Sequence, residues 1–378
     1  MDWDTTGRSS APSPEAKLLP TDARAHNRAL VLRTVLRAAP VSRADISRIT
    51  GLSRITVSEL VSGLVADGAI AEAGARETTG RPGKPATLLR VNPDAFAVVA
   101  VDLSQPRRFA GRLVALDGAA LHEAAVEGDL RGEAALAAVV DLVARLAAAS
   151  ESPLGGIGVG SPGIVDDDGV VVESTNLGWR RLALAELLTE RFGVPAVVEN
   201  DVNAAITAEL GSARPSDTLL VRIGTGVGGA AVIGGRLVRG ANHAGGEIGH
   251  ILLRPGADDE TTVERAVQEL VARVRELRDG EQGAETRAEL AEAHRRIGEM
   301  LGEGLLSAVA MLDVPEVIVQ GPAVLDLAAV AAVAQEAITT RRALVSGRRC
   351  VVRPGSRGDD VVIAGVAGIV RQRALASF

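Results

Sequence analysis

The sequence predicts an α/β protein in which a small helical domain precedes a larger body of two lobes. Three observations support this prediction. Residues 24–91 contain short capped helices and a hairpin, apolar strands alternate with Ala/Leu-rich helices from residue 96 onward, and a set of three strands followed by helices occurs twice. A chain of 378 residues is long enough for two or three domains and a large core.

Composition narrows the possible functions. Hydrophobic residues make up 47% of the chain, aromatic residues only 2%, and Tyr is absent, so we expect no aromatic platform for stacking single-stranded nucleic acid. The single cysteine, Cys350, excludes an intrachain disulfide and a Cys-based zinc site. Residues 1–23 are rich in Ser, Pro and Thr without an apolar signal segment, and no later apolar run reaches membrane-spanning length. We therefore expect a cytoplasmic protein with a flexible N-terminal tail and no membrane partner.

The charge is unevenly distributed. Residues 24–90 contain eleven Lys or Arg residues against five acidic residues, a net charge of +6, so the rest of the chain carries −13 and the whole chain −7. A basic N-terminal part on an acidic body indicates that only the N-terminal part contacts a polyanion.

The basic part has the pattern of a helix-turn-helix. Helical spacing of apolar residues predicts a first helix over residues 24–39, which a proline ends. Ser42 caps a short second helix that closes at Gly51. Ser53 then caps a third helix from Arg54 to about Ala66, which has its own apolar stripe.

The third helix and the hairpin after it supply the candidate DNA contacts. Polar side chains off the apolar stripe suit a helix that enters a major groove: Ser53, Arg54, Thr56, Ser58 and Glu59. The hairpin has a proline-stiffened tip, GRPGKP, and forms a wing suited to phosphates or a minor groove; its cationic residues are Arg76, Arg81 and Lys84. A small dimerisation module with solvated arginines is the alternative reading.

The first lobe begins with three apolar strands and leads to a candidate acidic residue. Strands are expected at 97–103, 112–116, 119–126, 156–160 and 196–198, and helices at 133–148, 184–192 and 203–210. Asp201 follows the last of these strands, where open α/β sheets place ligand chemistry. It can accept a proton from a sugar hydroxyl while Asn200 bonds a neighbouring hydroxyl, or it can simply cap the next helix.

The second lobe opens with a glycine-rich stretch. Strands at 219–223, 230–233 and 236–239 surround the loop 224–229 and a Gly234-Gly235 turn. Glycine is this dense where the backbone takes positive φ or approaches something closely, and such loops suit phosphate, although plain turn chemistry is common too. Further elements are expected at 261–279, 286–312, 316–319 and 323–340, with a C-terminal helix within 361–375.

Five motifs in this order resemble those of the ROK family, which comprises repressors, open reading frames of unknown role and sugar kinases: GSPGIV (160–165), NLGW (176–179), ENDVNAA (199–205), GTGVGGA (224–230) and GGEIGH (245–250). The resemblance implies a two-lobed, actin-like (ribonuclease-H-like) sugar-kinase fold behind a winged helix-turn-helix. The implied parts are a tail (1–23), the winged helix-turn-helix (24–91), a first lobe (92–212) with a C-terminal helix at about 364–378 packing back on it, and a second lobe (213–363).

The resemblance also implies roles for individual residues. In the kinase members the Asp of the END motif is the base for the attacking sugar hydroxyl, which corresponds to Asp201, and Asn200 lies beside it. Glu247 and His250 would contact sugar hydroxyls, with Glu264 as a further candidate from a more diverged region. The phosphate-loop residues would be Asp102, Gly224, Thr225 and Gly226.

The chain departs from the kinase pattern in ways that favour a sensor over an enzyme. The family's first phosphate loop, Asp-x-Gly-Gly-Thr, reads DLSQPRR from Asp102, so both glycines and the Thr are gone and Pro106 removes a donor. His250 is not followed by the family's Cys-rich zinc loop, so no zinc is expected. Gly321-Pro322 replaces the usual Gly-Gly of the adenine pocket.

We therefore expect a sugar-responsive transcriptional regulator, a repressor, that is not an enzyme and needs no zinc, ATP or magnesium. Its partners would be double-stranded operator DNA, a sugar or sugar derivative, and further copies of itself in a homodimer or tetramer. Two alternatives stay open. One is an ATP-dependent, glucokinase-like sugar kinase with a regulatory DNA-binding arm, and the other is a DNA-binding protein whose cleft is vestigial and which responds to a partner protein instead.

Overall fold

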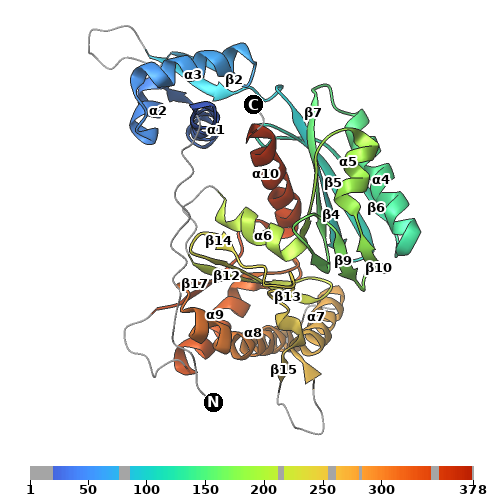
Figure 1. Ribbon diagram of the computed structural model, residues 1–378. Coiled ribbons are helices and arrows are strands. Elements are labelled where there is room, and N and C mark those ends of the chain that lie inside the picture. Colours follow the sequence, from blue (N-terminus) through green and yellow to red (C-terminus); the bar gives the residue numbers. More distant parts are fainter. Residues whose placement is uncertain are drawn as a thin grey trace, which may run out of the picture. The chain divides into compact units, whose positions relative to one another are not determined.

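The computed structural model describes residues 20–75, 86–211, 217–253, 261–280, 283–341 and 349–376 (Figure 1). The chain forms two compact units. One comprises Met1–Asn92 with Leu375–Phe378, and the other, called the body below, comprises Pro93–Ala374.

The N-terminal unit contains a helix-turn-helix and a small sheet. Its elements are α1 (Pro20–Ala38), β1 (Val41–Ser42), α2 (Arg43–Thr50), α3 (Arg54–Ala66), β2 (Ile70–Ala75) and β3 (Thr87–Val91), with strand order β1-β3-β2. The Ser42 hydroxyl accepts from the Asp45 N–H at 3.2 Å, and the Asp45 carboxylate accepts from Ser42 in return. The Ser53 hydroxyl caps α3 by accepting from the Thr56 N–H at 3.1 Å. The capped helices therefore begin where the sequence predicts them.

The first lobe of the body is a five-stranded sheet with strand order β11-β7-β4-β5-β6. Its main elements are β4 (Ala97–Gln105), β5 (Arg108–Ala115), β6 (Ala120–Glu127), α4 (Gly132–Ala148), β7 (Leu154–Ser161), α5 (Leu184–Phe192), β11 (Ala196–Asn200) and α6 (Asp201–Leu210). Apolar residues of α4 and α5 pack with those of the strands into one core. A second small sheet, absent from the predicted elements, consists of β8 (Ile164–Val165), β9 (Val171–Ser174) and β10 (Trp179–Leu182).

The second lobe repeats the topology of the first. Its sheet order, β14-β13-β12-β17-β18, is the first lobe's order read from the other edge, with the same antiparallel and parallel pairings. The strands are β12 (Thr218–Ile223), β13 (Val227–Ile233), β14 (Arg236–Leu237), β17 (Glu316–Gln320) and β18 (Val351–Pro354), and the helices are α7 (Val263–Asp279), α8 (Ala284–Leu312) and α9 (Leu327–Arg341). The short elements η1 (Ile248–His250), β15 (Leu252–Leu253), β16 (Thr261–Thr262) and η2 (Gly358–Asp360) complete it. The recurring order agrees with the predicted duplication.

The C-terminal helix α10 (Val361–Ala376) packs on the first lobe's sheet (Figure 1). Glycines alternate along β7 on the face that meets α10. A Cβ on Gly160 would lie 2.2 Å from a Val362 methyl, and one on Gly158 would lie 2.9 Å from a Val370 methyl. The missing side chains therefore allow α10 to approach the sheet closely.

Several element boundaries differ from the predictions, and two of the differences have a clear local reason. The strand expected at 236–239 ends at Leu237, after which Arg239 turns its side chain toward Glu199 of the first lobe. The helix expected from Asn203 begins at Asp201, because the Asn200 side chain caps it. Among the described residues no single helix is long and apolar enough to cross a membrane. The helices α2 and α3, which are bent against each other, reach the required length and hydropathy only when they are taken together.

Candidate functional site

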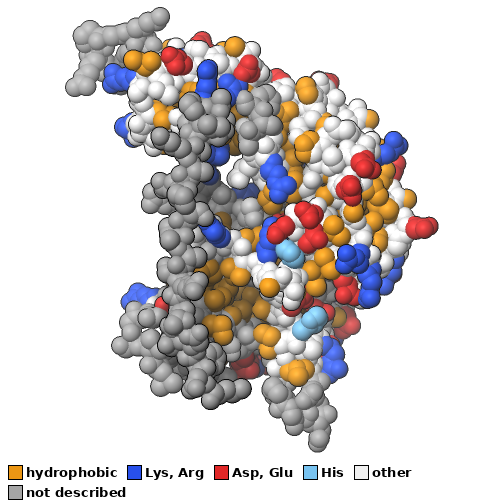
Figure 2. Space-filling model, in the orientation of Figure 1, with side chains coloured by type: hydrophobic (Ala, Val, Ile, Leu, Met, Phe, Trp, Pro, Cys, Tyr) orange, Lys and Arg blue, Asp and Glu red, His pale blue; other side chains and the backbone are white. Residues whose placement is uncertain are grey.

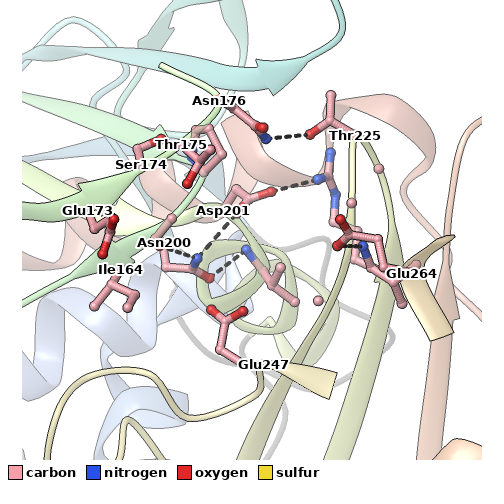
Figure 3. Close-up of a pocket in the computed structure, with 18 of the residues that line it drawn as sticks. Ile164, Glu173, Ser174, Thr175, Asn176, Asn200, Asp201, Thr225, Glu247 and Glu264 are labelled. Atoms are coloured by element: carbon pink, nitrogen blue, oxygen red, sulfur yellow. Dashed lines mark hydrogen bonds and ion pairs between the residues drawn. The ribbon is translucent and has the colours of Figure 1, made fainter. Parts of the chain in front are cut away.

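A cavity of about 350 Å³, called the inter-lobe cleft below, opens between the two lobes of the body (Figure 3). The first lobe contributes the β8–β9 region and the junction of β11 with α6, and the second contributes the glycine loop, η1 and the start of α7. Eight of the predicted residues line it: Asn200, Asp201, Gly224, Thr225, Gly226, Glu247, His250 and Glu264. Segments separated by more than 60 residues in sequence therefore meet at one site.

Asn200 forms the N-terminal cap of α6. Its amide oxygen accepts from the N–H groups of Val202 (2.9 Å) and Asn203 (3.0 Å). Its amide nitrogen donates to the Gly163 carbonyl at 2.9 Å and to the Asp201 carboxylate at 3.3 Å. All four hydrogen-bonding positions of this amide therefore have protein partners, and Asn200 holds the helix start and the neighbouring carboxylate in place.

Asp201 points its carboxylate into the inter-lobe cleft from the first turn of α6 (Figure 3). The residue is only 7% exposed, and this burial raises its pKa to about 6, although the positive charge of Arg222 acts in the opposite direction. The capping role belongs to Asn200, so the Asp201 carboxylate is available to pair with Arg222.

Arg222 of β12 is not among the predicted site residues, yet its guanidinium joins the two lobes. One nitrogen donates to the Asp201 carboxylate at 2.7 Å, and the other donates to the Ser104 hydroxyl at 3.1 Å. The signal in the sequence is a single arginine within the apolar run Leu219–Ile223. A buried charge in such a strand requires a partner, and Asp201 supplies it.

Asp102 is fully buried behind Ser104 at the end of β4 and does not line the inter-lobe cleft. Its carboxylate accepts from the Ser104 N–H at 2.8 Å, from the Ser104 hydroxyl at 2.6 Å and from the Gln105 amide at 3.2 Å. The residues that follow Asp102 therefore satisfy its carboxylate themselves.

The glycine loop 224–229 owes its composition to close packing. None of its glycines, all of which lie in the described part of the chain, has a positive φ. Instead, a Cβ on Gly226 would lie 2.6 Å from the Glu264 carboxylate, and one on Gly228 would lie 2.7 Å from a Val202 methyl. The Val227 N–H donates to Glu264 at 3.1 Å, so a protein carboxylate already occupies one donor of this loop.

Glu247 and His250 enter the cleft from the segment around η1. The His250 Nδ1 atom lies 3.8 Å from a Glu247 carboxylate oxygen, and both side chains are exposed. Gly246 precedes them at φ +102°, where a Cβ would lie 1.9 Å from the Gly229 carbonyl oxygen. Only glycine fits there, which explains why the acid and the imidazole stand in a glycine-rich frame.

A second ionic bridge between the lobes connects Arg239 to Glu199, and neither residue is among the predictions. The Arg239 guanidinium donates to the buried Glu199 carboxylate at 2.8 Å and lies 3.3 Å from Asp167. The hydrogen bond to Glu199 raises the pKa of Arg239 above its ordinary value. Across the cleft itself, the Asn176 amide donates to the Thr225 hydroxyl at 3.2 Å.

On the face of the body that Figure 2 shows, Lys or Arg, Asp or Glu, and His side chains lie close together. No group of three or more His, Cys, Asp or Glu side chains in the described ranges could hold a metal ion. Cys350, the only cysteine, is buried in the core of the second lobe. No cysteine follows His250 in the sequence before Cys350, so the chain lacks the donors of the family's Cys-rich zinc loop.

The predicted base-contacting residues lie on the first turns of α3. Ser53, Arg54, Ser58 and Glu59 are exposed, and Thr56 is half-buried with its hydroxyl 2.8 Å from that of Ser53. Ile55 is 74% exposed on the same turn and was not predicted. The wing residues Arg76, Arg81 and Lys84 lie outside the described residues.

The ROK family profile matches residues 100–373, which is most of the chain. The chain belongs to the ROK family. The xylose repressor of Caldicellulosiruptor bescii is 30% identical over 237 residues, covering 59% of this chain and 58% of that protein. The match thus spans about three-fifths of the repressor's length.

Solved structures support the fold of both units. A ROK family transcriptional regulator described as a homologue of the E. coli MLC protein superposes with a TM-score of 0.72 at 19% identity, covering 94% of this chain and 97% of that one. A glucokinase from Streptomyces griseus in complex with glucose and AMPPNP gives a TM-score of 0.57 at 24% identity, covering 73% and 99%. The predicted fold class, a helix-turn-helix followed by a two-lobed actin-like body, is confirmed.

Proposed function

We propose that this chain is a sugar-responsive transcriptional regulator, a repressor, that binds double-stranded operator DNA with its N-terminal unit and a sugar or sugar derivative in the inter-lobe cleft. The observation that carries the proposal is a polar cleft lined by Asp201, Glu247 and His250 in a chain that also has a capped helix-turn-helix. The ROK family membership and the relatives named as xylose repressors support the regulatory role.

The DNA contacts come from the exposed side chains at the start of α3. Arg54 has the length and donors for a guanine edge or a phosphate, and Ser58 and Glu59 offer shorter contacts to bases. The wing residues Arg76, Arg81 and Lys84 hold the backbone or the minor groove in this proposal. A protein with this role works in the cytoplasm as a homodimer or tetramer on a paired operator.

The sugar contacts come from acceptors that face the inter-lobe cleft. Asp201, Glu247 and Glu264 accept hydrogen bonds from sugar hydroxyls, and His250 adds a donor or an acceptor. Asn200 acts as a positioning residue for Asp201, because its own amide is fully engaged.

Coupling between sugar and DNA follows from ionic bridges that span the lobes. A hydroxyl that binds Asp201 competes with Arg222 for the same carboxylate and therefore changes the relative free energies of open and closed lobe arrangements. The Arg239–Glu199 pair provides a second contact whose geometry depends on lobe closure. Sugar and operator are then linked through one equilibrium between two arrangements.

The DNA assignment is tested by selecting bound duplexes from genomic fragments and measuring affinity by fluorescence anisotropy. Arg54→Ala should relax discrimination at one base pair by about 1–3 kcal/mol, whereas Arg81→Ala should weaken binding to all sequences alike. Arg145→Ala, on the exposed side of α4, is the matched control for loss of one positive charge. Unchanged affinity and specificity in both test variants would show that the N-terminal unit is not the DNA-binding element.

A sugar kinase is the second candidate, favoured by Asp201 beside the GTG loop. Against it, Arg222 pairs with the would-be base, and Ser104 and Gln105 fill the first loop. Coupled measurement of ADP release with a panel of pentoses and hexoses decides between them. If the wild type turns over a sugar and Asp201→Asn abolishes that turnover, the protein is a kinase.

Thermal-shift screening with the same sugars separates a sugar sensor from a protein whose cleft is vestigial.

A further inference from the structure

Arg222 lies between two buried carboxylates that belong to the other lobe. Its side chain is 11% exposed and that of its partner Asp201 is 10% exposed, so little solvent screens the pair. From the second nitrogen the contacts continue to the Ser104 hydroxyl and from there to the fully buried Asp102. The result is an unbroken chain, Asp201–Arg222–Ser104–Asp102, with one positive and two negative charges.

The same guanidinium separates two cavities. The inter-lobe cleft lies on one side, and a smaller cavity of about 170 Å³ lies on the other; Arg222 and Gly224 line both. The smaller cavity is also lined by Arg275, Gly321 and Pro322. The Arg222 guanidinium therefore lies on the route of a phosphoryl group from the smaller cavity to a sugar in the cleft. It is also paired with Asp201, the residue that would act as the base for the sugar hydroxyl.

Phosphoryl transfer in a sugar kinase needs a divalent cation that carboxylates hold against the phosphates. The residues present do not fit such an ion. The Asp102 oxygens accept from Ser104 and Gln105, and the Asp201 carboxylate accepts from Arg222 and Asn200. A dication placed among them would also lie close to an existing positive charge in a poorly solvated site, where repulsion is strong.

We propose that Arg222 is a resident cation that takes the place of the divalent metal ion, so that the cleft binds its sugar independently of nucleotide and metal. Arg222 thereby determines which ligands the cleft accepts, and its removal frees the Asp201 carboxylate and the Ser104 hydroxyl, so that a divalent cation can take the place of the guanidinium. The part that concerns sugar rests on the proposed function, whereas the part that concerns metal rests on the Arg222 contacts alone.

The test measures Mn²⁺ binding to the full-length protein by electron paramagnetic resonance of the free ion, without DNA or sugar. The wild type should bind no Mn²⁺ in the cleft, with or without ATP. Arg222→Ala should bind one Mn²⁺ per chain, with an affinity on the order of a hundredfold above that of any Mn²⁺ binding by the wild type. The reason is that the repelling charge of Arg222 is gone and the carboxylates need a counterion. Arg222→Lys, which keeps the charge, is the matched control and should behave as the wild type.

Further variants keep the result interpretable. Arg222→Met preserves most of the side-chain volume and serves if the alanine variant does not fold. Adding Asp201→Asn to either neutral variant should abolish the new site. The proposal would be overturned if the wild type bound Mn²⁺ and the substitution Asp102→Asn removed that binding. It would also be overturned if Arg222→Ala and Arg222→Met both folded and bound no more Mn²⁺ than Arg222→Lys. Because the measurement contains no operator, a failure of the DNA assignment leaves its outcome unaffected.

Discussion

Replacing Asp201 by Asn should change how the stability of the body depends on pH. The native carboxyl is buried, and its pKa is raised from 3.8 to about 6. The folded state therefore holds the proton more tightly than the unfolded state does. Below about pH 4 the group is protonated in both states, and above about pH 6 it is ionised in both, with the charged form penalised in the folded state.

As pH rises from 4 through 6, the wild type should lose stability relative to Asp201→Asn, because Asn has no proton to release. The rise of the Asp201 pKa from 3.8 to about 6 corresponds to roughly 3 kcal/mol over this interval. The unpaired Arg222 in the variant adds an offset of its own, but this offset does not vary with pH because arginine stays charged.

Urea unfolding followed by tryptophan fluorescence measures this difference. Trp179 is 6% exposed in the first lobe, and its indole N–H donates to the Gly132 carbonyl at 2.9 Å. A Trp3→Phe background makes Trp179 the sole tryptophan, so the signal reports on that lobe. A wild-type-minus-variant free energy that is flat between pH 4 and 7, or that rises with pH, would refute the assigned burial of this carboxyl.

Three further predictions concern other parts of the chain. Gly160→Ala should destabilise the body by about 1–3 kcal/mol in thermal unfolding, because the new methyl would lie 2.2 Å from Val362; Gly368→Ala on α10, with open space around it, is the control and should stabilise or be neutral. Ser42→Ala should cost the N-terminal unit about 0.5–2 kcal/mol through loss of the capping box, and equal melting of the two proteins would contradict this. The logarithm of operator affinity should fall with the logarithm of salt concentration by roughly 0.9 per phosphate contacted, so a flat salt dependence would argue against phosphate contacts.

Local rules were sufficient to predict the helices of the N-terminal unit. Ser42 and Ser53 are capping residues followed by apolar periodicity, and both cap the expected helices. The paired glycines at 234–235 both take positive φ, as the expected two-residue turn requires. In each case the signal lies within a few residues of the structure that it specifies.

Contacts between distant segments escaped prediction for the same reason. Arg222 and Arg239 find their acids in the other lobe, 21 and 40 residues away in sequence, and no local pattern reports which acid will face which arginine. The small sheet after β7 was missed because its strands have only two to four residues and too little alternation to count. Asn200 and Asp201 are predicted from their place at the end of a strand, whereas the roles of Glu247, His250 and Glu264 are predicted only through the family resemblance, which records three-dimensional proximity that composition and periodicity lack.

The most direct test is an anisotropy titration of the selected operator duplex with and without the sugar that stabilises the protein in thermal-shift screening. For the wild type, sugar should change the operator dissociation constant by about 5- to 150-fold. Glu247→Gln should keep the sugar-free affinity and lose most of that response. An operator affinity indifferent to every sugar that binds, or a response that survives loss of the cleft carboxylates, would contradict a cleft that controls DNA binding.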